Sequence, residues 1–419
     1  MDGTKLKSPA ELLAERTQRV QAAHELRVPD RVPIALNFGY MLARLGGITN
    51  QELERNTDKA QELLEQYAQY FEPDIITGLG FLPHASIALG DRQTKWAGYG
   101  LDENGTFQYV EDEYMQAEEY DAFLDDPTDF TLRKFLPRAF RELEGLAELP
   151  RLPIMLLGYS SIRAVRAFSA PPVMSALNAL SNAGKELDQL GASARANSKP
   201  MQDLGFPMSF GTSSLITAPF DFMSDTLRGM RGIMLDMFRR PEKLLAAMKK
   251  VIPIVVEFAV SAAKRTGVPY CSIPLHRGSD GFMSIKQFET FYWQSFKEMI
   301  LGLIEGGVIP SVFYEGVYDQ RLEYLRELPK GKTIARFDRS DMFKVKEVVG
   351  DVMCIQGGFP VSLLQGGTRE QIRDLTKTLC EKVGKDGGFI MGPSTSISEA
   401  EPELVKIWVD ATREYGVYS

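Results

Sequence analysis

The chain contains few of the residues that most often carry metal or thiol chemistry. Its 419 residues include three cysteines, Cys271, Cys354 and Cys380, and three histidines. The cysteines are odd in number, lie far apart and form no CxxC pair, so the sequence predicts no disulfide framework. We therefore expect a reduced, cytoplasmic protein.

Several signals of location and ligand are also missing. The first residues, Met1–Lys7, contain no apolar core, so we expect no signal peptide. The longest apolar stretch, 251–263, is interrupted by Pro253 and Glu257 and is too short to span a bilayer. The net charge is −8 and there is no basic block, which argues against nucleic-acid binding. The sequence contains no GxxxxGK[ST], GxGxxG or GxSxG motif, so nothing predicts a nucleotide site or a hydrolase nucleophile.

A recurring unit of a short apolar segment followed by a helical pattern is what the sequence does contain. Each apolar segment stops at polar or glycine residues, and this alternation predicts a parallel sheet closed into a barrel. Composition agrees, because 44% hydrophobic and 25% charged residues are typical of a globular protein with a sizeable core. The clearest segments are 268–273, 309–316, 332–338, 351–358 and 387–392. Further strands are expected at 30–36, 74–78, 153–158 and 207–213.

Helices are expected between these strands, and one segment breaks the pattern. Ser8 and Glu11 have capping-box spacing at the start of a helix over 8–28. Other helices are predicted over 49–70, 171–203, 224–239, 241–265 and 401–415. Residues 82–150 instead contain a hairpin-like strand at 106–111 and an acidic stretch. We interpret 82–150 as an insertion or lid that covers a pocket or meets a partner, or equally as a solvated loop and helix, within a single domain over 1–419.

Two candidate catalytic residues follow neighbouring strands. In parallel barrels the chemistry lies where strands end. His276 lies just past a buried strand, next to Arg277, where a histidine can bind metal, transfer protons or donate to a substrate. Glu315 ends the next strand, on the same side as Phe313 by strand alternation. A buried carboxylate is costly unless it is paired or bound to metal, so we expect Glu315 in the pocket or paired with a nearby arginine.

Three further polar residues lie at strand ends. Asp338 is a candidate ligand or base, although helix capping explains its neighbourhood equally well. Gln356 belongs to the same edge of the barrel. Tyr314 points away from Glu315 on an ideal strand, but the twist of a strand end leaves it a candidate acid–base group.

The order of several short motifs resembles that of a known superfamily. The motifs lie in 30–33, 220–229 with Pro241-Glu242, 284–288, 350–360 and 388–394. In this order they resemble the uroporphyrinogen decarboxylase superfamily, which includes the decarboxylase and corrinoid-linked methyltransferases. The resemblance implies a (β/α)8 TIM barrel with its site at the C-terminal ends of the strands, here with N-terminal helices and the inserted segment near 82–150. It also implies a homodimer.

Two departures from the superfamily narrow the function. The decarboxylase carries an Arg-Gln-Ala-Gly-Arg-Tyr motif after its first strand. The corresponding segment of this chain, residues 35–41, contains no arginine. The resemblance therefore does not extend to porphyrin decarboxylation. Thiol-directed methyltransferases carry His-x-Cys-Gly and a later cysteine, and here Phe313 and Glu315 replace the histidine and cysteine, with Thr395 at the later position. No thiolate-rich zinc site is expected.

Three functions remain after these departures. The first is a corrinoid-dependent methyltransferase acting on a small non-thiol substrate such as an aryl methyl ether, with zinc held by Glu315 and His276, and with Asp338 as a further ligand. Cobalamin would then be carried by a separate corrinoid protein. The second is a metal-free decarboxylase or lyase in which Glu315, His276 and Tyr314 transfer protons. The third is an inert small-molecule-binding protein.

Aromatic residues near strand ends suggest a pocket for a flat apolar substrate, although the same residues would also fit the core. An anionic group could meet Arg277, Arg336 or Arg339. The substrate-binding residues we predict are Phe38, Tyr40, Phe220, Phe313, Arg277 and Gln356.

Overall fold

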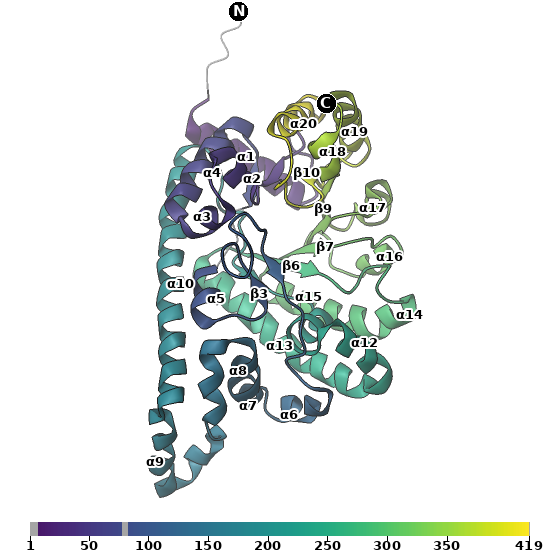
Figure 1. The fold of residues 1–419 in the computed structure, drawn as a ribbon. Helices are drawn as coiled ribbons and strands as arrows, with labels where there is room; N and C mark the ends of the chain where they lie inside the picture. Colours follow the sequence, from purple (N-terminus) through teal and green to yellow (C-terminus); the bar gives the residue numbers. More distant parts are fainter. Residues whose placement is uncertain (1–6, 78–82, 419) are drawn as a thin grey trace, which may run out of the picture.

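The computed structural model describes residues 7–77 and 83–418 and shows parallel strands surrounded by helices (Figure 1). Strands β5 to β10 pair in chain order, and β1 pairs with β2. A parallel bridge between Ile34 and Met391 places β1 next to β10. The predicted α/β barrel with eight parallel strands is therefore confirmed. The strands are β1 (Ala35–Asn37), β2 (Ile75–Thr77), β5 (Ser214–Leu215), β6 (Tyr270–Leu275), β7 (Ile309–Tyr314), β8 (Ile334–Phe337), β9 (Cys354–Phe359) and β10 (Phe389–Pro393).

One end of the barrel is closed by an apolar plug. The first inward-facing side chains of the strands pack together there, and α1 (Pro9–His24) covers them with Val20 and Ala23. Helix α1 begins where the capping box predicts, because the Glu11 amide donates to the Ser8 side chain and the Ser8 amide donates to Glu11. Because the plug lies at the N-terminal ends of the strands, access to the barrel interior comes from the opposite end. The strand residues of the plug are Ala35, Ile75, Tyr270, Ile334, Cys354 and Ile390.

Helices pack against the outer face of the strands, where alternate strand residues join the main core. The helices that begin at Asn50, Pro241 and Pro402 start within one residue of the predicted positions 49, 241 and 401. The helices around the strands are α2 (Met41–Gly46), α3 (Asn50–Arg55), α4 (Thr57–Phe71), α11 (Pro219–Asp221), η7 (Phe222–Arg228), α12 (Gly229–Arg239), α13 (Pro241–Thr266), α14 (Ile285–Gln287), η8 (Phe288–Trp293), α15 (Gln294–Glu305), α16 (Leu322–Leu325), α17 (Met342–Val349), α18 (Val361–Gly366), α19 (Arg369–Lys382) and α20 (Pro402–Tyr415).

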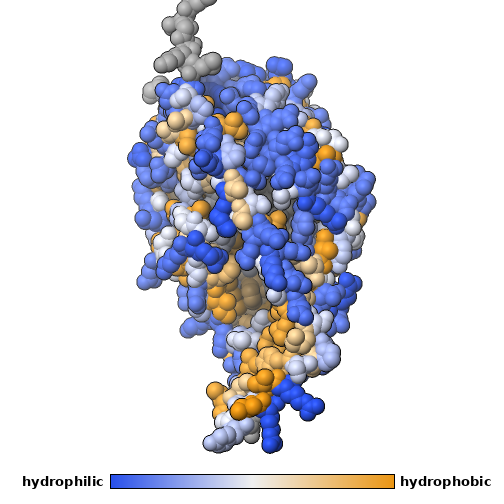
Figure 2. Space-filling model, turned by 90° about the vertical axis from the view of Figure 1, so that its left-hand side faces the viewer, coloured by the Kyte–Doolittle hydropathy of each residue, from blue (hydrophilic) through white to orange (hydrophobic). Residues whose placement is uncertain are grey.

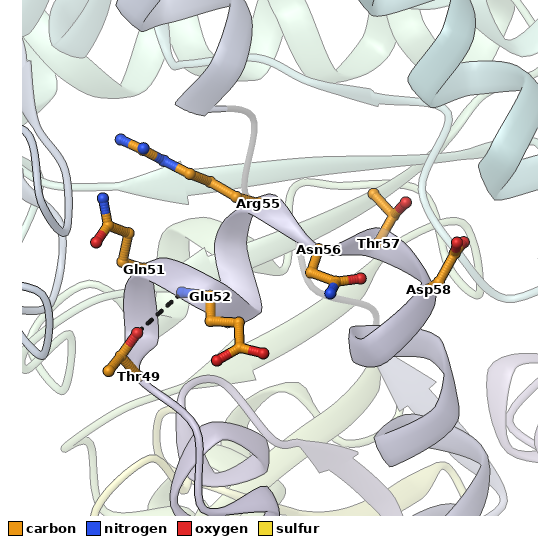
Figure 3. Close-up of a pocket in the computed structure, with 7 residues that line it drawn as sticks. All are labelled: Thr49, Gln51, Glu52, Arg55, Asn56, Thr57 and Asp58. Atoms are coloured by element: carbon orange, nitrogen blue, oxygen red, sulfur yellow. Dashed lines mark hydrogen bonds between the residues drawn. The ribbon is translucent and has the colours of Figure 1, made fainter.

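The predicted helix over 49–70 is two helices. Asn56 ends α3 and caps α4, since its side chain accepts a 3.0 Å hydrogen bond from the Lys59 amide. Thr49 caps α3 in the same way, through the Glu52 amide at 3.1 Å. Figure 3 shows the polar depression at this junction. Thr49 and Asn56 cap helices there, so these two polar residues have a structural role. The depression is lined by Thr49, Gln51, Glu52, Arg55, Asn56, Thr57 and Asp58.

The chain leaves the barrel between β2 and β5, which share no ladder within residues 7–77 and 83–418. The excursion contains an antiparallel strand pair, in which Thr94 faces Tyr109, as the hairpin-like pattern at 106–111 predicted. Its elements are α5 (Pro83–Leu89), β3 (Thr94–Lys95), β4 (Gln108–Tyr109), η1 (Ala117–Glu119), α6 (Tyr120–Asp125), α7 (Pro127–Phe130), η2 (Thr131–Phe135), α8 (Leu136–Ala139), η3 (Arg141–Glu148), η4 (Leu152–Leu156), η5 (Gly158–Ser160), α9 (Ser161–Ala164), η6 (Val165–Ser169) and α10 (Pro171–Asp203).

An arm extends from the barrel along α10 (Figure 1). The 33 residues of α10 match the predicted helix and span about 50 Å. The strand predicted at 153–158 is wrong. Those residues form short 3-10 turns at the far end of the arm, because no sheet lies beside them to pair with. We call residues 152–169 the arm tip.

Apolar side chains of the arm tip face solvent. Tyr159 is 97% exposed and Leu156 is 85% exposed. Figure 2 shows apolar surface gathered at this end of the molecule. No helix in the described residues combines the length and apolarity needed to cross a bilayer.

A buried ion pair ties the excursion to the barrel. Arg228 donates from Nε to Asp236 at 2.6 Å, and the hydroxyl of Tyr120 donates to the same carboxylate oxygen at 2.8 Å. All three side chains are buried, and Tyr120 lies in α6 whereas Asp236 lies in α12. Their contact fixes the excursion against the helices that follow β5.

Candidate active site

A pocket of about 510 Å³ opens at the C-terminal ends of β6 and β7. This is the end opposite the apolar plug, and it is the position at which barrel enzymes carry their chemistry. Charged side chains of both signs line it. The lining residues are Tyr109, Thr217, Asp225, Thr226, His276, Arg277, Ser279, Glu315, Gly316 and Arg339.

His276 and Glu315 converge in this pocket because their strands are in register. Leu275 and Tyr314 are partners at the ends of β6 and β7, so the next residue of each strand lies at the same level. The Nε2 atom of His276 is 3.7 Å from Oε2 of Glu315. The Glu315 side chain is 53% exposed, so the pair faces the open pocket and not the core.

The other ring nitrogen of His276 is held by Asp225. Nδ1 donates to Oδ2 of Asp225 at 2.5 Å, and this places Nε2 toward Glu315. The hydrogen bond to Asp225 raises the pKa of His276, although burial opposes the shift; the charges of Asp221, Asp225 and Glu315 also raise it. The imidazole is therefore protonated more readily than a free histidine, and its second proton lies on the atom that faces the pocket.

Asp221 binds the backbone at His276. It accepts hydrogen bonds from the amides of His276 and Arg277, at 3.0 and 3.1 Å, and from the hydroxyl of Tyr292 at 2.7 Å. Burial, reinforced by the charge of Asp225, raises the pKa of Asp221 to about 6. Because it binds backbone amides of the segment after β6, Asp221 fixes the position of His276 relative to the strand.

Arg277 compensates part of the negative charge. Its Nη2 atom lies 3.0 Å from Glu111 and 3.2 Å from Asp225, and Nε donates to Ser224 at 3.1 Å. Glu111 belongs to the excursion, as does Tyr109, whose hydroxyl donates to the carbonyl of Asp225. Side chains from the excursion therefore complete one wall of the pocket.

Deeper in the barrel, the inward-facing residues above the plug are partly accessible, whereas most of their outward-facing neighbours are buried under the helices. Phe313 and Gln356, both predicted to contact substrate, lie in this inner wall and flank Arg336 across β7, β8 and β9. The partly accessible inner residues are Asn37, Ser272, Pro274, Ser311, Phe313, Arg336 and Gln356.

A family model described as uroporphyrinogen decarboxylase (URO-D) matches residues 198–415. The chain belongs to the uroporphyrinogen decarboxylase family. The matched region runs from the end of α10 to the end of α20 and contains His276, Glu315 and Arg336. The matched region also contains strands β5 to β10 and the pocket residues Asp225 and Arg277, whereas Tyr109 and Glu111 lie outside it.

Solved structures extend this likeness to the fold of the whole chain. A methyltransferase from Methanosarcina mazei aligns with a TM-score of 0.61 and 15% sequence identity, over 96% of this chain and 98% of that one. A B12-independent methionine synthase from Shewanella sp. W3-18-1, in complex with selenomethionine, aligns with a TM-score of only 0.32 and 9% identity, over 48% and 60% of the two chains, which is too weak to support an argument. No curated protein matches the chain.

Several residues predicted for the site lie outside the pocket. Tyr314 faces outward and stacks on Phe337 at 4.8 Å, because strand alternation holds to the end of β7. Its complete burial raises the pKa of its hydroxyl well above the ordinary value. Phe38 and Phe220 are buried in the main core, and the hydroxyl of Tyr40 donates to Glu54 at 2.6 Å. These four positions serve packing, which corrects the expected pocket roles.

Asp338 lies at the pocket edge but makes backbone contacts. It accepts a 3.1 Å hydrogen bond from the Gly316 amide, and Arg339 lies 3.3 Å from the same oxygen. Gly316 has a φ of 91°, a conformation that glycine adopts readily. Asp338 thereby fixes the turn that follows Glu315.

His276 and Glu315 provide part of the ligand set that a metal ion would need. No group of three or more His, Cys, Asp or Glu side chains converges on one point in 7–77 and 83–418. His276 and Glu315 nevertheless present a nitrogen and an oxygen to the same space, and Asp225 holds the far ring nitrogen, as carboxylates behind zinc-bound histidines do. Catalytic zinc has three protein ligands and one position open to water or substrate, so His276 and Glu315 supply two of the ligands that such a site needs.

Asp221 and Asp225 were missed by sequence reasoning. They stand four residues apart in the segment after β5, within and beside the π-helical η7, and that spacing puts them on one helix face. π-Helical turns are common at functional sites, but the sequence does not reveal one. The usable signal was two carboxylates just past a barrel strand.

Proposed function

We propose that this protein is a methyltransferase that moves a methyl group from a small non-thiol substrate, such as an aryl methyl ether, to a corrinoid held by a separate protein. The observation that carries the proposal is the convergence of His276 Nε2 and Glu315 at 3.7 Å, with Asp225 behind the histidine. Nitrogen and carboxylate donors suit an oxygen substrate better than a thiol. The three cysteines are all buried, so none supplies a thiolate to the pocket.

In this proposal zinc is held by Nε2 of His276 and the carboxylate of Glu315. The chemistry it supplies is Lewis-acid polarisation of the ether oxygen. Asp225 keeps the proton of His276 on Nδ1 and leaves Nε2 free as a ligand. Arg277 offsets the charge of Asp225 and Glu111, so that the pocket does not repel an electron-rich substrate.

Metal analysis tests this assignment. Zinc is supplied, excess is removed, and the bound metal is measured by mass spectrometry for the wild type, His276→Ala, Glu315→Gln and Asp338→Asn. We expect about one zinc per chain in the wild type, strong loss in the first two variants and retention in Asp338→Asn, whose carboxylate binds the Gly316 amide. A wild-type protein that takes up no zinc would contradict the proposal.

A second function is supported by one observation. The hydrogen bond to Asp225 raises the pKa of His276, so in the metal-free site the nitrogen that faces the pocket takes up a proton more readily than in a free histidine. Such a group suits a metal-free decarboxylase or lyase, in which it would protonate the carbanion left by bond cleavage.

Turnover that survives a strong chelator and is lost in His276→Ala would favour this function over methyl transfer.

A further inference from the structure

Arg336 has no charge partner. It lies in the inner wall of the barrel on β8, one position from the end of the strand, and is partly accessible from the interior. Its guanidinium carbon lies 5.0 Å from the centre of the Phe313 ring. Among the described residues, no side chain or carbonyl accepts a hydrogen bond from it, and no carboxylate lies within ion-pair distance.

The other arginines near the pocket lie beside carboxylates. Arg277 pairs with Glu111 and Asp225, and Arg339 is largely exposed beside Asp338. For Arg336, burial lowers the pKa and no neighbouring charge raises it. A cation held without an anion in a poorly solvated place is costly, and native folds rarely leave one there without a functional reason.

We propose that Arg336 binds the carboxylate of an aromatic substrate whose ring packs against Phe313. This proposal rests on the proposed function in one respect, because both place the substrate inside the same barrel. A guanidinium recognises a carboxylate through two parallel hydrogen bonds, and this recognition is strong where water is excluded. Gln356, the register partner of Arg336 on β9, is placed to add an amide contact.

The depth of Arg336 sets the length of the substrate. Arg336 is level with Phe313, and Glu315 is two residues further along β7 on the same side. Two residues of strand span about 7 Å, which is the length of one substituted benzene ring. A carboxylate on Arg336 therefore places the opposite end of an aromatic ring near His276 and Glu315. The substrate class is a benzoate that carries its reacting group across the ring from the carboxylate.

Calorimetric binding of benzoate and its neutral analogue benzamide tests the proposal. We expect benzoate to bind the wild type at least about tenfold more tightly than benzamide, the scale of one charge-assisted contact. Arg336→Met should remove this preference, Arg336→Lys should keep part of it, and Arg339→Met should keep it. Arg336→Met should also unfold at a higher temperature than the wild type without ligand, because a cation without a charge partner in the barrel interior has been replaced by an apolar side chain of similar length.

The opposite results would overturn the proposal. They are failure of benzoate to bind the wild type, equal binding of benzoate and benzamide, or an unchanged benzoate preference in Arg336→Met. The thermal measurement shows whether each variant is folded. Benzoate binding needs neither zinc nor a corrinoid. A wild-type protein that binds benzoate but no zinc would therefore refute the proposed function and leave this inference standing. A protein that binds zinc but not benzoate would refute this inference and leave the proposed function standing.

Discussion

His276 is bound by one carboxylate and faces another. Asp225 holds Nδ1 and Glu315 lies 3.7 Å from Nε2, so the two ring nitrogens have separate tasks. The raised pKa of His276 also links the site to stability. Its partners stabilise the fold fully below pH 6.5, the ordinary value of the ring, and this contribution is lost as pH rises through the higher pKa of the folded state.

Substitution of Asp225 by Asn should lower the pKa of His276, because the hydrogen bond to the carboxylate is the main cause of the upward shift. Proton NMR of the ring resonances measures it directly, since only three histidines are present and His276→Ala assigns the signal. His24 provides an internal reference, because burial lowers its pKa to about 4. An unchanged midpoint in Asp225→Asn would show that Asp225 does not control the histidine.

The sequence predicted some of the site residues and not others, for a physical reason. His276 and Glu315 were identified because each is the first residue after a strand whose end the pattern marked. Asp225 was missed because it reaches His276 from 51 positions away, through a π-helical turn that no periodicity reveals. Phe38 was misplaced because a short apolar run does not show which of its alternate residues face inward. Tyr314 was kept as a candidate because a strand end can twist, whereas the alternation of β7 holds to its last residue.

At the scale of elements, helix and strand periodicity predicted most of the barrel. Helix α10 and helix α20 were placed within a residue, because both begin at a proline in the first turn. The strand predicted at 153–158 failed because an apolar run of that length does not distinguish a buried strand from an exposed turn. The split between α3 and α4 depends on one cap, Asn56, within an otherwise continuous pattern.

The buried contact between Asp236, Arg228 and Tyr120 joins two elements that the sequence could not pair. Asp236→Ala should destabilise the protein by about 3–5 kcal/mol, since it leaves Arg228 buried with less compensation. Urea unfolding followed by circular dichroism measures the loss. Tyr120→Phe is the control, because it removes one hydrogen bond to the same carboxylate and should cost about 1 kcal/mol. Equal effects of the two variants would argue against a dominant ion pair.

At the scale of the whole molecule, the barrel was predictable and the arm was not. The strand–helix alternation implied a closed parallel sheet. The excursion between β2 and β5 is longer than the predicted insertion, because the helix over 171–203 was assigned to the barrel when it is the body of the arm. Helical periodicity gives an element and its amphipathic face, but not the part of the molecule against which it packs.

The arm tip should be the first place at which trypsin cuts the folded protein. Arg163 and Arg166 are exposed there, on single turns that contact mainly one another and the start of α10. Brief digestion followed by intact mass spectrometry should show cleavage after one of them, and an Arg163→Gln, Arg166→Gln variant should resist it. First cleavage within the barrel would show that the tip is better protected than its contacts imply.

The position of the tip has a practical consequence for protein engineering. It lies at the far end of α10 from α1 and the C-terminal helix α20 (Figure 1). Among the described residues, no atom lies within 4 Å of the place that the first carbon of a side chain added at Gly158 would take. A complete folded domain, such as a fluorescent protein, inserted at Gly158 would stand about 50 Å from the barrel end of the helix and leave the strand ends accessible. The arm is therefore a third attachment point on this chain, separate from both termini.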